Sequence, residues 1–187
     1  MTTISTAARR AARWAVLPAA AALGLGLTAL SAPTAEAAAH YCNGYRATIV
    51  GTNGSDEIEG TSGRDVIVGL GGHDEIDGNG GNDIICAGSG NDEVDGGSGN
   101  DWISGSAGHD DLEGGSGRDT IHGGSGNDHL EGESGRDKLY GNSGRDLVEG
   151  GSGKDKVSGG SGADVVRQGK ASDRVEDRWE DRNRDDD

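Results

Sequence analysis

From Gly51 to Arg167 the hydrophobic and polar positions of the chain follow a strict nine-residue pattern. In all 13 units the eighth position is Ile, Val or Leu, the fourth is Gly and the sixth is Asp. The single aliphatic residue lies between two outward positions, as Ile58 does between Glu57 and Glu59. This alternation predicts one short strand with one buried side chain in each unit. The glycines and polar residues before each strand predict a turn.

The unit resembles the RTX, or hemolysin-type, calcium-binding repeat G-G-x-G-x-D-x-U-x, where U is a large aliphatic residue. The resemblance implies an all-β fold, a parallel β-roll (β-solenoid) with two nine-residue units per coil. Each unit then forms a six-residue turn and a three-residue strand, and lies beside the unit two places further on. The second position departs from Gly in several units, which we expect to alter the affinity of neighbouring sites but not the roll: Thr52, Thr61, Leu70, Asn79, Ser106, Glu133 and Asn142.

Composition indicates that such a roll needs a further source of stability. Hydrophobic residues make up 31% of the chain and aromatic residues 3%. A core one residue wide buries too little apolar area to offset the entropy lost in ordering the backbone. Adjacent coils lie about 4.8 Å apart, so that Asp56 faces Asp74, and an ion midway falls in the range of about 2.3 to 2.6 Å for calcium–oxygen bonds. Turn carbonyls complete the oxygen shell, and magnesium fits less well because it needs shorter bonds.

The candidate calcium ligands are the sixth-position aspartates. Pairing each of the 13 units with the unit two places on predicts up to about 11 calcium ions and couples folding to their binding. The alternative, that the Gly-Asp turns belong to a flexible linker, does not account for columns that stay in phase throughout. The aspartates are Asp56, Asp65, Asp74, Asp83, Asp92, Asp101, Asp110, Asp119, Asp128, Asp137, Asp146, Asp155 and Asp164.

The two ends of the chain differ from the repeat, and the N-terminal end predicts export of the protein. Residues 1–39 carry three arginines followed by an apolar stretch from Trp14 to Leu30, the layout of a secretory signal peptide cleaved after Ala37 or Ala39. We therefore expect a secreted, extracellular protein with no membrane span after cleavage. Residues 40–50 are assigned to an N-terminal cap, 51–167 to the roll, and 168–187 to a degenerate repeat with a charged C-terminal cap or tail. The net charge of −16 excludes nucleic acid as a partner and favours cations.

The sequence offers no catalytic apparatus. Residues 40–50 leave no room for a catalytic domain before the repeat, and the five histidines form no HExxH pair. No serine lies in a G-x-S-x-G setting between a strand and a helix. We therefore predict a non-catalytic structural or adhesive calcium-binding module. A remnant of, or accessory chain to, a secreted RTX enzyme or toxin is the alternative; ice binding is disfavoured because Thr52 and Thr61 do not continue into a threonine array.

Outward residues of alternate units predict two different faces. Odd units carry an acidic column at the ninth position: Glu59, Asp77, Asp95, Glu113, Glu131 and Glu149. Even units instead begin with an apolar patch formed by Val66, Val68, Ile84 and Trp102. Such an 18-residue alternation is expected of a coil with two sheets. A patch of this kind is either covered or serves as a surface for a cell-surface or protein partner.

The segment before the repeat supplies a candidate cover. His40 to Tyr45 lack the turn pattern, and we expect them to fold back over Val50 and Val68 with Tyr41 and Tyr45 supplying apolar area. A regular roll would leave the Cα atoms of Cys42 and Cys86 more than about 7 Å apart, too far for a disulfide. Folding back brings the two cysteines together. The sequence therefore predicts a Cys42–Cys86 disulfide that closes the cap.

Overall fold

The computed structural model describes residues 39–167, 169 and 174–175 of the chain. The predicted signal peptide, apart from Ala39, lies outside the described residues, and so does residue range 176–187 of the predicted tail. Within the described residues no helix is long and apolar enough to cross a membrane.

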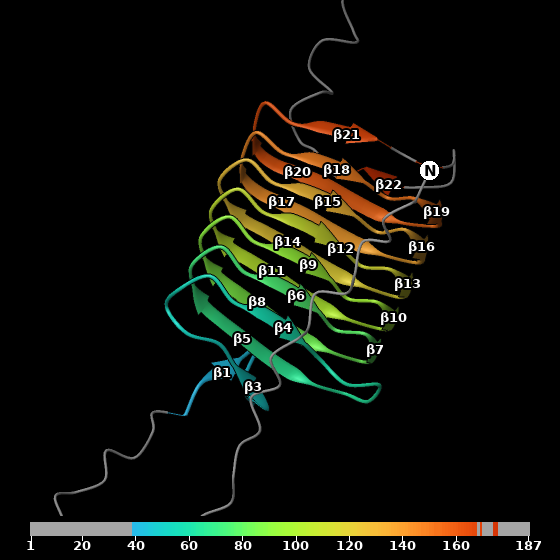
Figure 1. Ribbon diagram of the computed structural model, residues 1–187. Coiled ribbons are helices and arrows are strands. Elements are labelled where there is room, and N and C mark those ends of the chain that lie inside the picture. The colour runs from blue at the N-terminus through green and yellow to red at the C-terminus, as the bar shows by residue number, and fades with distance from the viewer. Residues whose placement is uncertain (1–38, 168, 170–173, 176–187) are drawn as a thin grey trace, which may run out of the picture. The chain divides into compact units, whose positions relative to one another are not determined.

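The repeat forms a parallel solenoid in which register partners are 18 residues apart, as Ile58 and Ile76 are. Its coils stack along one axis (Figure 1). Strands of the odd units form a seven-stranded sheet, here called the odd sheet. Its members are β4 (Glu57–Glu59), β6 (Glu75–Asp77), β9 (Glu93–Asp95), β12 (Asp111–Glu113), β15 (His129–Glu131), β18 (Leu147–Glu149) and β21 (Val165–Arg167). The predicted β-roll, with units n and n+2 side by side, is confirmed.

The even units build the opposite, eight-stranded sheet, here called the even sheet. Its members are β3 (Ile49–Val50), β5 (Val66–Gly71), β8 (Ile84–Ser89), β11 (Trp102–Ala107), β14 (Thr120–Ser125), β17 (Lys138–Gly144), β20 (Lys156–Gly162) and β22 (Arg174–Val175). The turns of the even units also pair, in a five-stranded sheet at one edge of the solenoid. These short strands are β7 (Gly80–Gly81), β10 (Ser98–Gly99), β13 (Ser116–Gly117), β16 (Ser134–Gly135) and β19 (Ser152–Gly153).

The expectation of three-residue strands throughout was wrong for the even sheet. There the ladder continues into the first residues of the next unit, as in the pairing of Ser106 with Gly124. Five non-glycine residues at the second position adopt left-handed backbone angles, with φ between 63° and 81°: Leu70, Asn79, Ser106, Glu133 and Asn142. The departures from Gly therefore leave the roll intact, at a cost of about 1 kcal/mol each for a side chain in this region.

The core is a single column of eighth-position side chains between the two large sheets. Ile67, Ile85, Ile103 and Leu112 are all fully buried, and the column continues to Val157. Coils approach so closely that a Cβ atom at Gly90 would lie 1.4 Å from the carbonyl oxygen of Gly72. From Gly72 onward the fourth-position glycine is therefore required by coil stacking itself.

The N-terminal segment closes one end of the even sheet as a hairpin of β1 (Tyr41–Cys42) and β2 (Tyr45–Arg46). The predicted disulfide between Cys42 and Cys86 is present, with the two Cα atoms 5.8 Å apart. Cys42 packs on a buried cluster of Val66, Val68 and Ile84.

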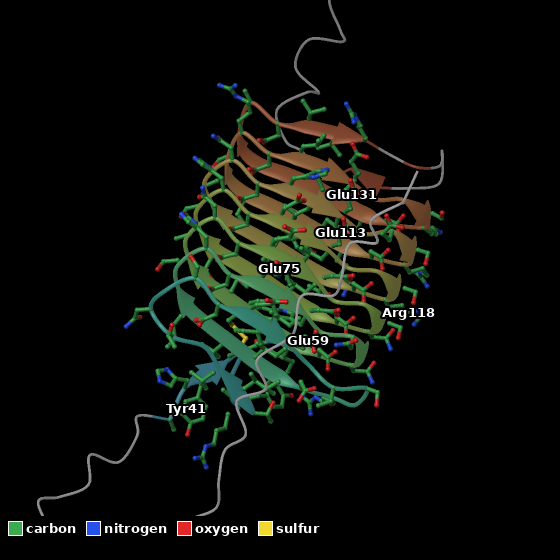
Figure 2. All side chains as sticks on the ribbon, in the orientation of Figure 1. Tyr41, Glu59, Glu75, Glu113, Arg118 and Glu131 are labelled. Carbon is green, nitrogen blue, oxygen red and sulfur yellow. A yellow bond between two sulfur atoms is a disulfide. The ribbon has the colours of Figure 1, made fainter. Side chains whose placement is uncertain are left out.

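Two details of the predicted cap were wrong. Tyr41 and Tyr45 are 62% and 50% exposed, and Val50 stays 43% exposed (Figure 2 shows Tyr41 at this end). The side chain of Tyr45 instead lies under the Arg64 guanidinium, 4.6 Å from the ring centroid. The small side chains of Cys42 and Ala47 cover the patch because the disulfide holds the hairpin against the sheet.

The predicted partner surface on Val66, Val68, Ile84 and Trp102 is corrected as well. The first three side chains are only 6–8% exposed, because the hairpin covers them. Trp102 alone keeps a half-buried ring.

Candidate metal centre

The sixth-position aspartates form two ladders, one along each edge of the solenoid. Eleven of the thirteen, from Asp65 to Asp155, are buried, with exposures between 1% and 6%. Asp56 and Asp164, at the two ends, are half-buried. The structure thus brings together the residues that the sequence selected; their role as metal ligands stays a prediction.

Each aspartate uses one carboxylate oxygen to join adjacent coils. The backbone N–H of Asp92 donates to Oδ1 of Asp110 at 3.0 Å, and the N–H of Asp110 donates to Oδ1 of Asp128 at 3.1 Å. The same bond recurs along both ladders up to Asp164. Sequence reasoning placed carboxylate directly against carboxylate, whereas the structure places a backbone amide between them. This hydrogen bond leaves the second oxygen for another partner.

The second oxygen, Oδ2, is buried without a hydrogen-bond partner in ten aspartates: Asp74, Asp83, Asp92, Asp101, Asp110, Asp119, Asp128, Asp137, Asp146 and Asp155. In nine of these ten units Oδ2 lies beside the first-position glycine; the unit of Asp92 has Ala87 at that position. A Cβ atom built on Gly105 would be 2.2 Å from Oδ2 of Asp110 and 2.8 Å from the carbonyl oxygen of Gly123 in the next coil. Carboxylate and carbonyl oxygens therefore converge on a space that glycine leaves open, and an all-oxygen set suits calcium.

Burial of Oδ2 without a donor disfavours the charged form of these carboxylates. Desolvation, followed by repulsion from neighbouring aspartates, raises the pKa of Asp110 and Asp119 to about 7. Desolvation likewise raises the pKa of Asp101, Asp137 and Asp146 to about 6. A row of buried, repelling carboxylates is an arrangement that a bound divalent cation stabilises.

Asp56 and Asp65 differ from the other aspartates because threonine occupies their Oδ2. The N–H and hydroxyl of Thr61 both donate to Asp65 Oδ2, at 2.7 and 2.8 Å. Thr52 makes the same two bonds to Asp56 Oδ2, at 2.6 and 2.9 Å. Burial alone would raise the pKa of Asp65, but hydrogen bonds, chiefly from Thr61, lower it overall.

Sequence reasoning missed this exception, although its signal was present. Threonine occupies the second position, four residues before the aspartate, in the first two units only. Their hydroxyl groups, which glycine lacks, are the hydrogen-bond donors that mark Asp56 and Asp65 as different.

Backbone oxygens are needed to complete any cation site along the ladders. Within the part of the chain that the structure describes, no three His, Cys, Asp or Glu side chains gather as a metal-binding group. The turn carbonyls beside the first-position glycines are the available oxygens. The donor set of carboxylate plus carbonyls fits calcium and is poorly suited to zinc, which favours His and Cys.

Comparison with known proteins agrees with this chemistry. A family model described as RTX calcium-binding nonapeptide repeat matches residues 50–85, 87–121, 104–139, 113–148 and 131–166. Together the matches span more than half of the chain. A search of curated proteins found no match.

Proposed function

The chain belongs to the RTX calcium-binding nonapeptide repeat family, and from this premise we propose that it is a secreted structural or adhesive module, without catalytic activity, that calcium assembles. Calcium binding by a β-roll is the property of the family. The finer role is supported by features of this chain. The observation that carries the proposal is the set of ten aspartate Oδ2 atoms that are buried without a hydrogen-bond partner.

The ten aspartates from Asp74 to Asp155 would hold the ions through Oδ2, together with turn carbonyls. Bound calcium supplies positive charge and an oxygen-coordinating centre. The protein supplies the cradle: Oδ1 fixes each carboxylate on the neighbouring coil, and first-position glycines such as Gly105 leave room beside Oδ2. Asp56 and Asp65 lie outside this set because threonine already satisfies their Oδ2 atoms.

This division of the ladders predicts a metal-independent first coil. Thr52 and Thr61 donate hydrogen bonds to the aspartate oxygens that a cation would otherwise contact. The Cys42–Cys86 disulfide holds the hairpin at this N-terminal end of the solenoid. The solenoid then has a preformed end on which calcium-dependent coils assemble, since each repeat contacts only its neighbours.

Calcium counting tests this assignment. Equilibrium dialysis of the Asp110→Asn variant should show loss of bound calcium, because the orphan oxygen of that site becomes an amide nitrogen. The matched Asp56→Asn variant should keep the wild-type count. Equal losses in the two variants would contradict the assignment.

Secretion and the adhesive role are tested on the native cell. The predicted signal peptide and the disulfide support export, because disulfides persist in oxidising compartments. N-terminal sequencing of protein from the medium should begin at Ala38 or His40. Retention on the cell surface in calcium and release by chelator would support adhesion; equal partition in both conditions would contradict it.

A further inference from the structure

A basic groove lies at the even-unit edge of a chain whose net charge is −16. It has a volume of about 360 Å³ and is lined by Arg118, Arg136, Lys138, Lys154 and Lys156, with Thr120 and two buried aspartates. Figure 2 shows Arg118 projecting outward at this edge. We propose that the basic groove binds an acidic polysaccharide chain lying along the solenoid axis.

The cations form two columns that run in register along the coils. Arg118, Arg136 and Lys154 occupy the fifth position of successive even units, and their strands pair through Ser116, Ser134 and Ser152. At the seventh position Lys138 pairs directly with Lys156. Coil spacing therefore presents a positive group about every 4.8 Å along a line. A thin polymer with regularly repeated acidic groups matches that pattern.

The fold itself does not require these cations. In the same fifth-position column nearer the N-terminus, Asn82 and Asn100 hydrogen-bond to each other, with both the N–H and Nδ2 of Asn100 donating at 2.9 Å. The seventh-position column there holds Val66 and Ile84 instead of lysine. Like charges opposite each other on adjacent strands destabilise a sheet. Arg118, Arg136 and Lys154 thus add like-charge repulsion between adjacent coils, which a ligand of opposite charge would offset.

The acidic side chains next to the groove do not neutralise it. Asp119 and Asp137 are 1% exposed, and the Oδ1 atom of each is bonded to a backbone amide of the preceding coil. Within the described residues, Arg118, Arg136 and Lys154 take part in no ion pair. Their charge is available to an external anion.

Aromatic rings beside the groove favour a sugar polymer. Tyr140 stacks on His122 with the ring centroids 4.9 Å apart, and Nζ of Lys156 lies 5.5 Å from the Tyr140 centroid. Aromatic walls with a few placed polar groups are typical of small-molecule and sugar sites. A wide polyanion such as duplex DNA would bring further phosphates against the acidic odd sheet, whereas a single thin chain contacts the groove alone.

The test is fluorescence anisotropy of a labelled heparin oligosaccharide with the full mature chain in saturating calcium. The variant Arg118→Asn/Arg136→Asn/Lys154→Asn uses the residue that the chain already carries at Asn82 and Asn100. We expect it to bind about tenfold more weakly or worse, since several charge contacts are lost. The matched control, Arg46→Asn/Arg64→Asn/Arg145→Asn, changes the net charge equally outside the groove and should bind as wild type.

Wild-type binding should weaken with added salt, and neutral dextran should not compete. Equal affinities of the two triple variants, competition by dextran, or tighter binding of duplex DNA than of heparin would each overturn the proposal. The proposal rests on the proposed function only in using the calcium-loaded roll. Circular dichroism of each sample separates the two, because absent binding with an intact β spectrum contradicts the groove and not the calcium-dependent fold.

Discussion

Acidification should fold the metal-free chain, because the buried carboxylates oppose folding only when they are charged. The pKa values of Asp110 and Asp119 reach about 7, and those of Asp101, Asp137 and Asp146 about 6, in the folded roll. An unfolded chain holds aspartate near its ordinary pKa of about 3.9. Groups whose pKa is raised by folding favour the fold below the unfolded pKa and oppose it as the pH rises through the folded pKa.

The magnitude is large enough to decide whether the roll forms. At about 1.4 kcal/mol for each pH unit between the folded and unfolded pKa, each of the five carboxylates opposes folding by about 3–4 kcal/mol above pH 7. Together they contribute on the order of 15 kcal/mol, as much as the whole stability of a typical domain of about 5–15 kcal/mol. Without calcium, the roll should therefore be lost at pH 8 and recovered toward pH 4.

The assay is circular dichroism of calcium-stripped protein at low concentration, titrated from pH 8 to pH 4, with sedimentation to verify a monomer. The variant Asp101→Asn/Asp110→Asn/Asp119→Asn should gain its β signal at a higher pH than wild type. The control Glu57→Gln/Glu75→Gln/Glu93→Gln removes three exposed carboxylates instead and should follow wild type. A β signal that is unchanged between pH 4 and pH 8, or larger at pH 8, would refute the reasoning.

Three further perturbations follow from the same contacts. Asp110→Ala should raise the calcium midpoint of folding more than Asp164→Ala, because among the described residues Asp110 hydrogen-bonds to coils on both sides and Asp164 to one. Equal midpoints would contradict coupling between neighbouring coils. Cys42→Ser/Cys86→Ser should lower the free energy of urea unfolding at saturating calcium by about 4 kcal/mol, because the two cysteines are 44 residues apart. A decrease below about 1 kcal/mol would mean that the disulfide does not stabilise the fold. Gly126→Ala should lower the free energy of unfolding by several kcal/mol in the same assay, because its Cβ atom would lie 1.5 Å from a carbonyl oxygen of the preceding coil. An unchanged urea midpoint would show that the coils are less closely stacked.

The repeat unit, through its resemblance to the RTX repeat, was sufficient to predict the architecture. The alternation of acidic and apolar outward residues supports an 18-residue coil. The disulfide follows from the segment before the repeat, which can fold back and bring Cys42 to Cys86, whereas a regular roll would hold the two cysteines too far apart. Both features depend on spacing along the chain, which the sequence states directly.

The finer features depend on which atom meets which partner. The sequence selects Asp65 and Asp110 alike, but hydrogen bonds from Thr61 distinguish the Oδ2 atom of one from the orphan Oδ2 of the other. The exposure of Tyr45 depends on how the hairpin lies on the sheet, which the disulfide decides. The basic groove could not be predicted from the net charge of −16, because a total charge says nothing about which basic residues lie together at one edge.

Calcium titration of the mature chain, followed by circular dichroism at pH 7.5, tests the central claim most directly. In chelator we expect a largely unfolded spectrum, and at the millimolar calcium levels found outside cells a cooperative change to a β-rich one, with magnesium a poor substitute. A chain that is already fully β-rich in chelator at that pH, and that does not respond to calcium, would contradict the account.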